Sequence, residues 1–206
     1  MKSVLISNRP KWCGKICHEI GKDENGKPIY EKRIEVRKTA PKEVPFKAYI
    51  YMTKKKPYML TFAGNGKMRV HNGMVIGEFI CDKVYKIEPI FSFYDSYSGY
   101  DDSSDSSYFE DYSIDNERLK ETCLTQQDLY IYGNGNRLYG WHISDLKIYD
   151  KPKELSEFRK SGFMTEEEWL FNLYPNTHCH YDAWAKKFEI TRPPQSWMYV
   201  EEIETR

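Results

Sequence analysis

Residues 32–38, Lys-Arg-Ile-Glu-Val-Arg-Lys, decide the fold prediction for this chain. Their alternation predicts a strand whose apolar residues point to one side while Glu35 and Arg37 point to the other. Lys32 enters from the preceding loop and can reach the space in front of Glu35 and Arg37. The sequence therefore predicts an ammonium, a carboxylate and a guanidinium on one side of a single strand.

Three roles fit this trio of charged side chains. A carboxylate between two cations stays ionised and can accept a hydrogen bond from a base amino group, while a guanidinium can hold a phosphate with paired donors. The same trio can perform acid–base chemistry, because a desolvated lysine beside another cation can lose its proton near neutral pH. The third role is a solvated strand face whose ion pairs each contribute about 0.2–1 kcal/mol. Spacing alone leaves all three open.

Short strands and single helices account for the rest of the pattern. Strands are predicted at residues 3–7, 46–52, 74–87, 138–149 and 197–203. Helices are predicted from an Asn8 cap to Gly21, from a Thr125–Asp128 capping box to residue 133, and at 153–161 and 165–173. This order does not suit a parallel doubly wound sheet and favours an α+β fold, namely a small, mostly antiparallel β-barrel with flanking helices.

The length of 206 residues predicts a single domain, residues 1–206, with insertions at about 95–121 and 156–187. Residues 95–115 are rich in Ser, Asp and Tyr, contain no basic residue and show no period, so we expect a solvated, mobile insertion there. The second insertion is expected to be helical.

The net charge of zero hides a segregation of charge. Residues 1–94 carry a net charge of +10, residues 95–121 carry −7 and residues 122–206 carry −3. A basic first portion can attract a polyanion, although charges that merely solvate different faces would give the same totals. No run of 18 uncharged apolar residues is present, so we expect a cytoplasmic protein with no membrane contact.

Five cysteines in no dense framework are typical of a reducing compartment. Cys13, Cys17 and His18 fall on one predicted helix, and His178-Cys179-His180 lies far downstream. Neither group has the two-residue spacing of a zinc knuckle, so we expect buried thiols, no metal and no cofactor.

Five segments taken together resemble the ASCH family of bacterial and phage proteins, which belongs to the PUA-like superfamily. These segments are residues 6–12, 32–39, 75–79, 141–144 and 193–197. The family signature is Gly-x-Lys-x-x-Glu-x-Arg, and Lys32, Glu35 and Arg37 fill its last three places. Tyr30 stands in the glycine place, after a loop longer than usual. The resemblance implies a PUA-like barrel whose signature faces a cleft that binds RNA or a nucleotide, with a modified base as one option.

Residues of the matched segments complete the expected nucleic-acid site. The full set is Asn8, Arg9, Lys32, Glu35, Arg37, Trp141, His142, Ser144 and Ser196. Some relatives are amidohydrolases that remove the acetyl group of N4-acetylcytidine with a lysine, a threonine and a glutamate. Here the threonine place holds Glu35, so we favour a binding module; if the chain is an enzyme, Lys32 and Glu35 are its catalytic residues.

Aromatic and basic residues could extend this site. Bases commonly stack on aromatic faces, at roughly 1–3 kcal/mol per base. We interpret Trp12 as a core residue, whereas Trp141 and Trp197 fit either core packing or stacking. The run Lys54-Lys55-Lys56, with Lys67 and Arg69, fits phosphate tracking or protection of a strand edge.

Overall fold

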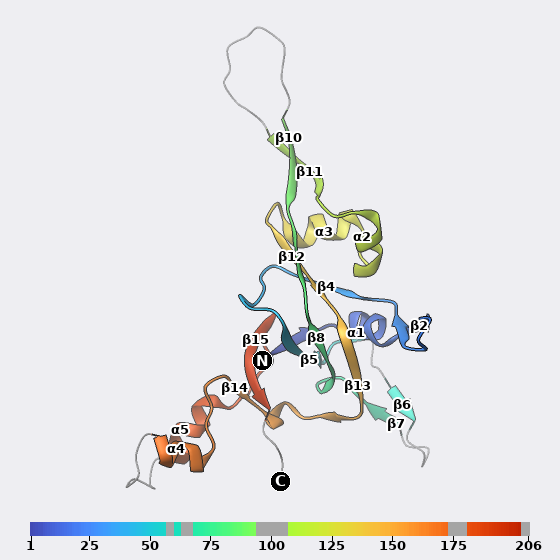
Figure 1. The fold of residues 1–206 in the computed structure, drawn as a ribbon. Helices are drawn as coiled ribbons and strands as arrows, with labels where there is room; N and C mark the ends of the chain where they lie inside the picture. Colours follow the sequence, from blue (N-terminus) through green and yellow to red (C-terminus); the bar gives the residue numbers. More distant parts are fainter. Residues whose placement is uncertain (57–59, 63–67, 94–106, 173–180, 203–206) are drawn as a thin grey trace, which may run out of the picture.

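The computed structural model describes residues 1–56, 60–62, 68–93, 107–172 and 181–202 (Figure 1). The largest sheet has the strand order β13-β8-β5-β1-β15-β14. Its strands are β13 (Ser144–Lys153), β8 (Val75–Cys81), β5 (Phe46–Met52), β1 (Ser3–Asn8), β15 (Trp197–Glu202) and β14 (Phe158–Lys160). β1 and β5 pair in parallel, and the other pairs of this sheet are antiparallel.

A second sheet of three antiparallel strands packs against the first. It has the order β4-β12-β9, formed by β4 (Ile34–Arg37), β12 (Leu138–His142) and β9 (Val84–Ile87). Fully buried Trp141 of β12 joins the two sheets, because it packs with Phe46 and with core residues of β1 and β8. The prediction of an α+β fold is confirmed. Among the described strands, the large sheet and the small sheet share no strand pair, so together they form no closed barrel.

Helices α2 (Asn116–Thr122) and α3 (Gln126–Gly133) cover the other face of the small sheet. The capping box predicted at Thr125 and Asp128 is present at the start of α3. Buried Ile34 and Val36 of β4 pack with Leu129 of α3 in one apolar cluster. The apolar side of β4 therefore faces the helices, and its charged side faces the large sheet.

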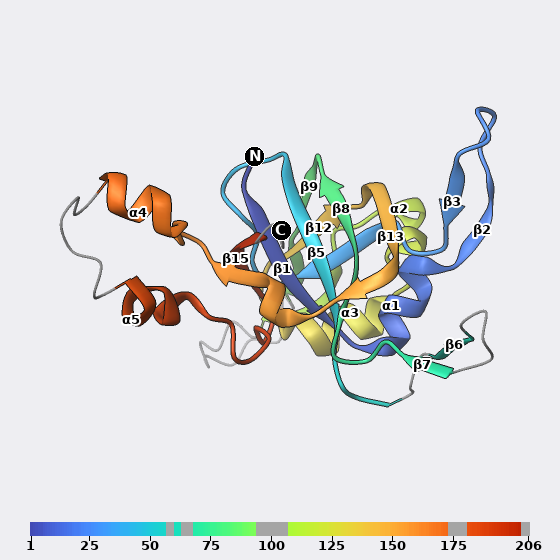
Figure 2. The same ribbon diagram turned by 90° about the horizontal axis from the view of Figure 1, so that it is seen from below.

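Helix α1 (Pro10–Cys17) is shorter than predicted. Its N-cap is Arg9, which makes no side-chain capping bond, and not Asn8. The chain leaves the helix after Cys17 because β2 (Glu19–Lys22) pairs with β3 (Pro28–Tyr30) in an exposed hairpin (Figure 2). The prediction that the helix continues to Gly21 is therefore wrong for the residues after Cys17.

Two long strand predictions each cover two strands in different sheets. Residues 74–87 form β8 and β9, and residues 138–149 fall in β12 and β13. The chain passes from one sheet to the other at Asp82-Lys83 and at Ile143. Backbone hydrogen bonds, such as the one from His142 N–H to the Lys83 oxygen, join these two bends. Neither bend contains a glycine or a proline, so no strong chain-breaking residue marks it in the sequence.

The predicted acidic insertion contains ordered elements. β10 (Pro89–Phe93) pairs with β11 (Ser107–Tyr112), Tyr112 is 2% exposed, and α2 follows. The expectation of a mobile segment is therefore wrong for residues 107–112, which form a strand, and the expectation of solvation is wrong for Tyr112, while residues 94–106 lie outside the described part.

The last third of the chain holds a small aromatic lobe beside the sheets (Figure 2). Residues 153–161 form one turn of 3-10 helix, Leu155–Glu157, followed by β14, where a helix was predicted. Helices α4 (Glu166–Asn172) and α5 (Tyr181–Ala185) follow, and their ring contacts include Trp169 with Trp184. The hairpin of β6 (Leu60–Phe62) and β7 (Met68–Val70), and the 3-10 turn Lys186–Phe188, complete the elements.

Candidate functional site

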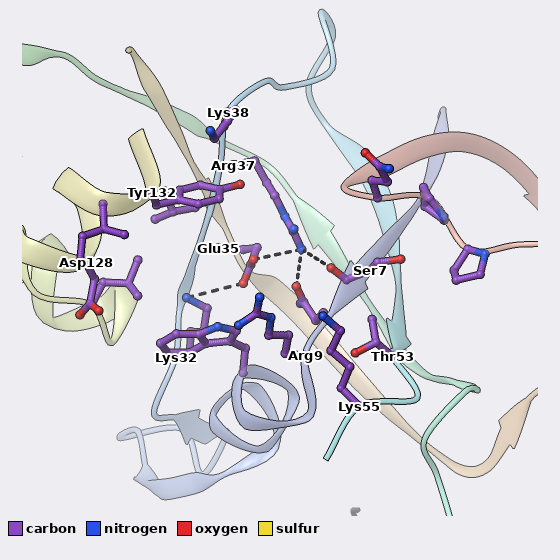
Figure 3. Close-up of a pocket in the computed structure, with 18 residues that line it drawn as sticks. Ser7, Arg9, Lys32, Glu35, Arg37, Lys38, Thr53, Lys55, Asp128 and Tyr132 are labelled. Atoms are coloured by element: carbon purple, nitrogen blue, oxygen red, sulfur yellow. Dashed lines mark hydrogen bonds and ion pairs between the residues drawn. The ribbon is translucent and has the colours of Figure 1, made fainter. Parts of the chain in front are cut away.

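The register between β4 and β12 places the charged trio. Glu35 pairs with Trp141 and Arg37 pairs with Tyr139, so these four side chains share the face that looks toward the large sheet. The end of β1 lies opposite this face. Lys32 stands two residues before β4, and its side chain reaches the same space (Figure 3). Lys32, Glu35 and Arg37 are 2%, 5% and 7% exposed. The interpretation of this trio as a solvated strand face is therefore wrong.

Lys32 is held by three different groups. Its Nζ donates to the main-chain oxygen of Thr122 at 2.6 Å and lies 3.5 Å from Oε2 of Glu35 and 5.3 Å from the ring centroid of Trp12. Thr122 ends α2, so the ammonium also meets the negative end of a short helix. Burial lowers the pKa of Lys32, and the charge of Glu35 opposes this shift.

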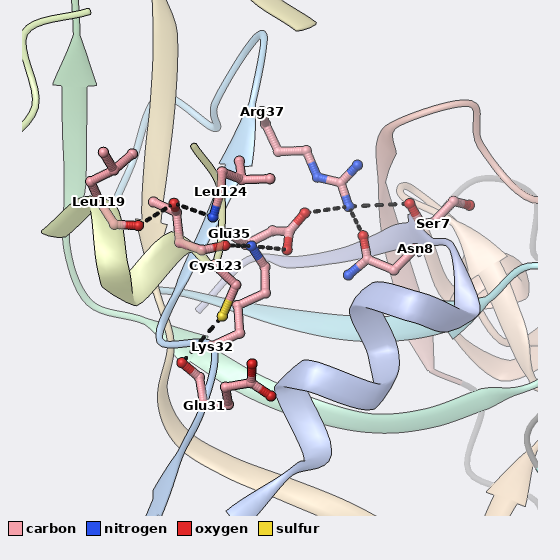
Figure 4. A network of polar contacts seen from close by, with 10 residues as sticks. Ser7, Asn8, Glu31, Lys32, Glu35, Arg37, Leu119, Cys123 and Leu124 are labelled. Carbon is pink, nitrogen blue, oxygen red and sulfur yellow. Dashed lines mark hydrogen bonds and ion pairs between the residues drawn. The ribbon is translucent and has the colours of Figure 1, made fainter. Parts of the chain in front are cut away.

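Arg37 links the trio to the end of β1 (Figure 4). One terminal nitrogen of its guanidinium lies 3.1 Å from Oε1 of Glu35 and 3.1 Å from the main-chain oxygen of Ser7, and it also donates to Oδ1 of Asn8. This single terminal nitrogen of Arg37 therefore holds the Glu35 carboxylate next to the end of β1. Such a buried charge is tolerated because it is both paired and hydrogen-bonded.

The trio forms part of the wall of a cleft of about 830 Å³. This volume is within the range of sites for small molecules. The lining residues come from β1, α1, β4, the end of β5, α3 and the loop before β15; they are Ser7, Asn8, Arg9, Trp12, Lys32, Glu35, Val36, Arg37, Lys38, Thr53, Lys55, Leu124, Asp128, Ile131, Tyr132, Pro193, Pro194 and Gln195. Arg9, Lys38 and Lys55 are exposed, so three cations stand at the rim above the buried trio.

Two aromatic rings border the same cleft. Trp12 of α1 lies near Lys32, and Tyr132 of α3 lies below Lys38, whose Nζ is 5.3 Å from the ring centroid. Burial raises the pKa of Tyr132, and the charge of Arg37 opposes the shift. The ring hydroxyl therefore stays protonated at neutral pH and can donate a hydrogen bond.

Five of the nine predicted site residues lie together in this cleft: Asn8, Arg9, Lys32, Glu35 and Arg37. Four others do not line it. Trp141 is wholly buried in the core, and Nδ1 of His142 is 2.6 Å from Oδ1 of Asp82. Ser144 donates from Oγ to the Ile80 oxygen, and the main-chain oxygen of Ser196 accepts a hydrogen bond from Ser7. In the described part of the chain these four residues lie outside the cleft and make contacts within the fold.

Sequence reasoning missed several lining residues. Trp12 was interpreted as core, yet it is half-buried at the cleft, and Lys55 is the member of the lysine run that reaches it. Ser7, Thr53 and Tyr132 were not singled out. No motif marks Thr53 or Tyr132, because they reach the cleft only through the β1–β5 pairing and the packing of α3.

Some predicted features fall outside the described residues, namely Lys67 and His178-Cys179-His180. In the described part, no three His, Cys, Asp or Glu side chains are grouped as metal ligands, and Cys13 and Cys81 are buried. Over the same residues, no helix combines the length and apolarity needed to cross a membrane.

Comparison with known proteins finds solved structures that are similar to this chain. No family model and no curated protein matches the sequence. Crystal structures of the ASCH protein from Zymomonas mobilis and of two of its single-residue variants are similar in fold, with TM-scores of 0.46, 0.46 and 0.45 and 14% sequence identity. The alignments cover 97–98% of this chain and 88–91% of those chains. The structural neighbours of this chain are thus ASCH domain proteins at low sequence identity.

Proposed function

We propose that the cleft binds RNA or a nucleotide, including one with a modified base, and that the chain is a cytoplasmic binding module of the bacterial and phage ASCH type with a PUA-like fold. In this proposal residues 1–206 form one domain, and the segments at about 95–121 and 156–187 are additions to it. The observation that carries the proposal is the buried trio of Lys32, Glu35 and Arg37 facing a cleft.

The composition of the cleft supports an anionic, partly planar ligand. Its lining includes five cationic side chains against the two carboxylates of Glu35 and Asp128. Exposed cations at a rim attract phosphates, and aromatic rings such as Trp12 and Tyr132 offer faces for a base. A cleft with a cationic rim, aromatic sides and a polar floor fits a nucleotide better than it fits an apolar metabolite.

The rim cations give the sharpest test. We expect the triple variant Arg9→Gln, Lys38→Gln, Lys55→Gln to fold normally, since all three side chains are exposed. If each residue contacts one phosphate, the slope of log affinity against log salt, which is negative, should become shallower by about 2 for single-stranded RNA, at about 0.7 per contact. Fluorescence anisotropy with a labelled oligonucleotide over a salt series measures that slope.

A matched control removes three exposed lysines away from the cleft, with Lys22, Lys27 and Lys151 changed to Gln. This control should keep the wild-type salt slope. Equal slopes for both triple variants, or no RNA or nucleotide binding by the wild-type protein, would contradict the proposal.

An amidohydrolase acting on acylated nucleosides such as N4-acetylcytidine is the alternative. One observation favours it: burial lowers the pKa of Lys32 while Glu35 stands beside it, so the pair can move a proton. The alternative requires turnover of an acylated nucleoside by the wild-type protein that is lost in Lys32→Met. Tight binding without any product would favour the binding module.

A further inference from the structure

Buried polar atoms without hydrogen-bond partners are concentrated in residues that line the cleft. Among the described residues, six buried side-chain nitrogen or oxygen atoms have no hydrogen-bond partner, and five of them belong to residues that line the cleft. These five are Oγ of Ser7, Nδ2 of Asn8, Oε2 of Glu35, Nε of Arg37 and Oγ1 of Thr53. A buried polar atom left without a partner costs about 1–3 kcal/mol, so a ligand that satisfies these atoms would recover that free energy.

The side-chain amide of Asn8 has a fixed orientation. The oxygen of the amide must face Arg37, because the guanidinium that approaches it has donors and no acceptor. Nδ2 is therefore the atom without a partner, on a side chain that is 3% exposed (Figure 4). The backbone fixes the position of Asn8 further, since Thr53 N–H donates to the main-chain oxygen of Asn8 at 2.9 Å.

The unpartnered atoms are richer in donors than in acceptors. Nδ2 of Asn8 and Nε of Arg37 can only donate, whereas Oε2 of Glu35 can only accept and already lies near Lys32. The hydroxyls of Ser7 and Thr53 can do either. A complementary ligand edge must therefore carry acceptors, such as carbonyl oxygens, where it meets Asn8.

We propose that Asn8 is a specificity-determining residue, whose fixed amide donor selects a nucleobase edge that presents a carbonyl oxygen over the same edge with an amino group. This inference rests on the proposed nucleotide binding and adds the class of base to it. A site built to donate a hydrogen bond discriminates against a ligand that presents a second donor, because two donors then face each other.

Two pairs of nucleotides test the proposal, because the members of each pair have the same charge and nearly the same shape. They are inosine and adenosine 5′-monophosphate, and uridine and cytidine 5′-monophosphate. We expect the wild-type protein to bind the carbonyl-bearing member of at least one pair about tenfold more tightly, as one good hydrogen bond predicts. Asn8→Asp keeps the oxygen that accepts from Arg37 and replaces the donor by an acceptor, so that ratio should fall to about one or invert. Calorimetry measures the dissociation constants.

The matched control is Gln195→Glu, the same change from amide to carboxylate at an exposed residue of the same cleft. It should weaken all four nucleotides by a similar factor and leave the ratios unchanged. Should Asn8→Asp fail to fold, the side-chain amide signal of Asn8 in labelled wild-type protein gives a second readout, and it should shift more with the carbonyl-bearing member.

The two levels of the proposal fail in different ways. Nucleotide binding with equal affinity within both pairs, or with ratios that Asn8→Asp leaves unchanged, overturns the role of Asn8 and leaves the proposed function standing. No binding of any nucleotide or RNA overturns both.

Discussion

At the scale of single residues, Lys32 shows how this chain tolerates a buried ammonium. The Thr122 oxygen, Glu35 and the Trp12 ring surround its Nζ, yet burial still lowers its pKa. Removing two charges from water costs several kcal/mol per ion, and pairing offsets only part of this cost. We infer that Lys32 serves the cleft more than it serves the stability of the fold.

The lowered pKa of Lys32 predicts a dependence of stability on pH. In the pH range below the unfolded value of about 10.4 and above the folded value, the unfolded chain binds more protons at this residue. Its contribution to the free energy of unfolding therefore rises with pH, by at most about 1.4 kcal/mol per pH unit. We expect Lys32→Met to lose this rise in urea unfolding measured over a pH series that extends up to the unfolded value.

The measurement compares the two proteins at each pH, because the raised pKa values of buried cysteines such as Cys81 act in the opposite direction in both. Exposed Lys22→Met is the control and should follow the wild-type curve. Parallel curves for Lys32→Met and the wild type would contradict the lowered pKa.

At the scale of elements, close contact between β8 and β13 depends on Gly77. A Cβ at this position would lie 2.5 Å from the main-chain oxygen of Lys147 and 3.2 Å from Cα of Ile148. Both atoms belong to the backbone of β13 and cannot move without shifting the strand. Glu78 of β8 also accepts a hydrogen bond from Tyr149 of β13 and forms an ion pair with Lys47 of β5, so β8 is tied to both of its neighbours at this point of the large sheet.

Gly77→Ala should lower the free energy of unfolding by about 1–3 kcal/mol, the usual cost of overpacking. Gly21→Ala in β2 is the control, since nothing lies within 4 Å of a Cβ there, and we expect a change of less than about 1 kcal/mol. Denaturant unfolding of both variants measures the difference. Equal effects would show that β8 and β13 do not approach as closely as described.

At the scale of the whole molecule, the cleft and the segment that joins β10 to β11 differ in the sign of their charged residues. The residues that line the cleft are mainly basic among the charged types, whereas residues 94–106 carry four aspartates and no basic residue. Figure 1 shows β10 and β11 extending away from the two sheets. At low ionic strength charges act over a Debye length of about 30 Å, so we expect the aspartates of residues 94–106 to weaken the attraction of a polyanion.

Replacing residues 94–106 by an Asn-Gly turn should preserve the fold, because Phe93 and Ser107 pair directly and a two-residue turn can join them. We expect tighter binding of RNA at low salt, with a gain that shrinks as salt rises. A full-length variant with Asp95, Asp101, Asp102 and Asp105 changed to Asn should give the same gain. Unchanged affinity in both variants at low salt would contradict this effect.

The sequence by itself determined features that depend on neighbours within a few residues. The alternation in residues 32–38 placed Glu35 and Arg37 on one face, and the spacing of Thr125 and Asp128 predicted the start of α3. Strand β5 was predicted with its observed bounds, Phe46–Met52. A period of two residues and a capping box are local properties, so they could be read without knowing what packs against them.

Only the tertiary structure decided which of these features meet. It buried Trp141 and left Trp12 at the cleft, the reverse of what was expected for Trp12, because burial depends on which sheet covers a ring. It bent residues 74–87 and 138–149 from one sheet into the other, and it brought Thr53 and Tyr132 to the trio through strand pairing and helix packing. These contacts join residues far apart in the chain, and the residue types alone do not specify their partners.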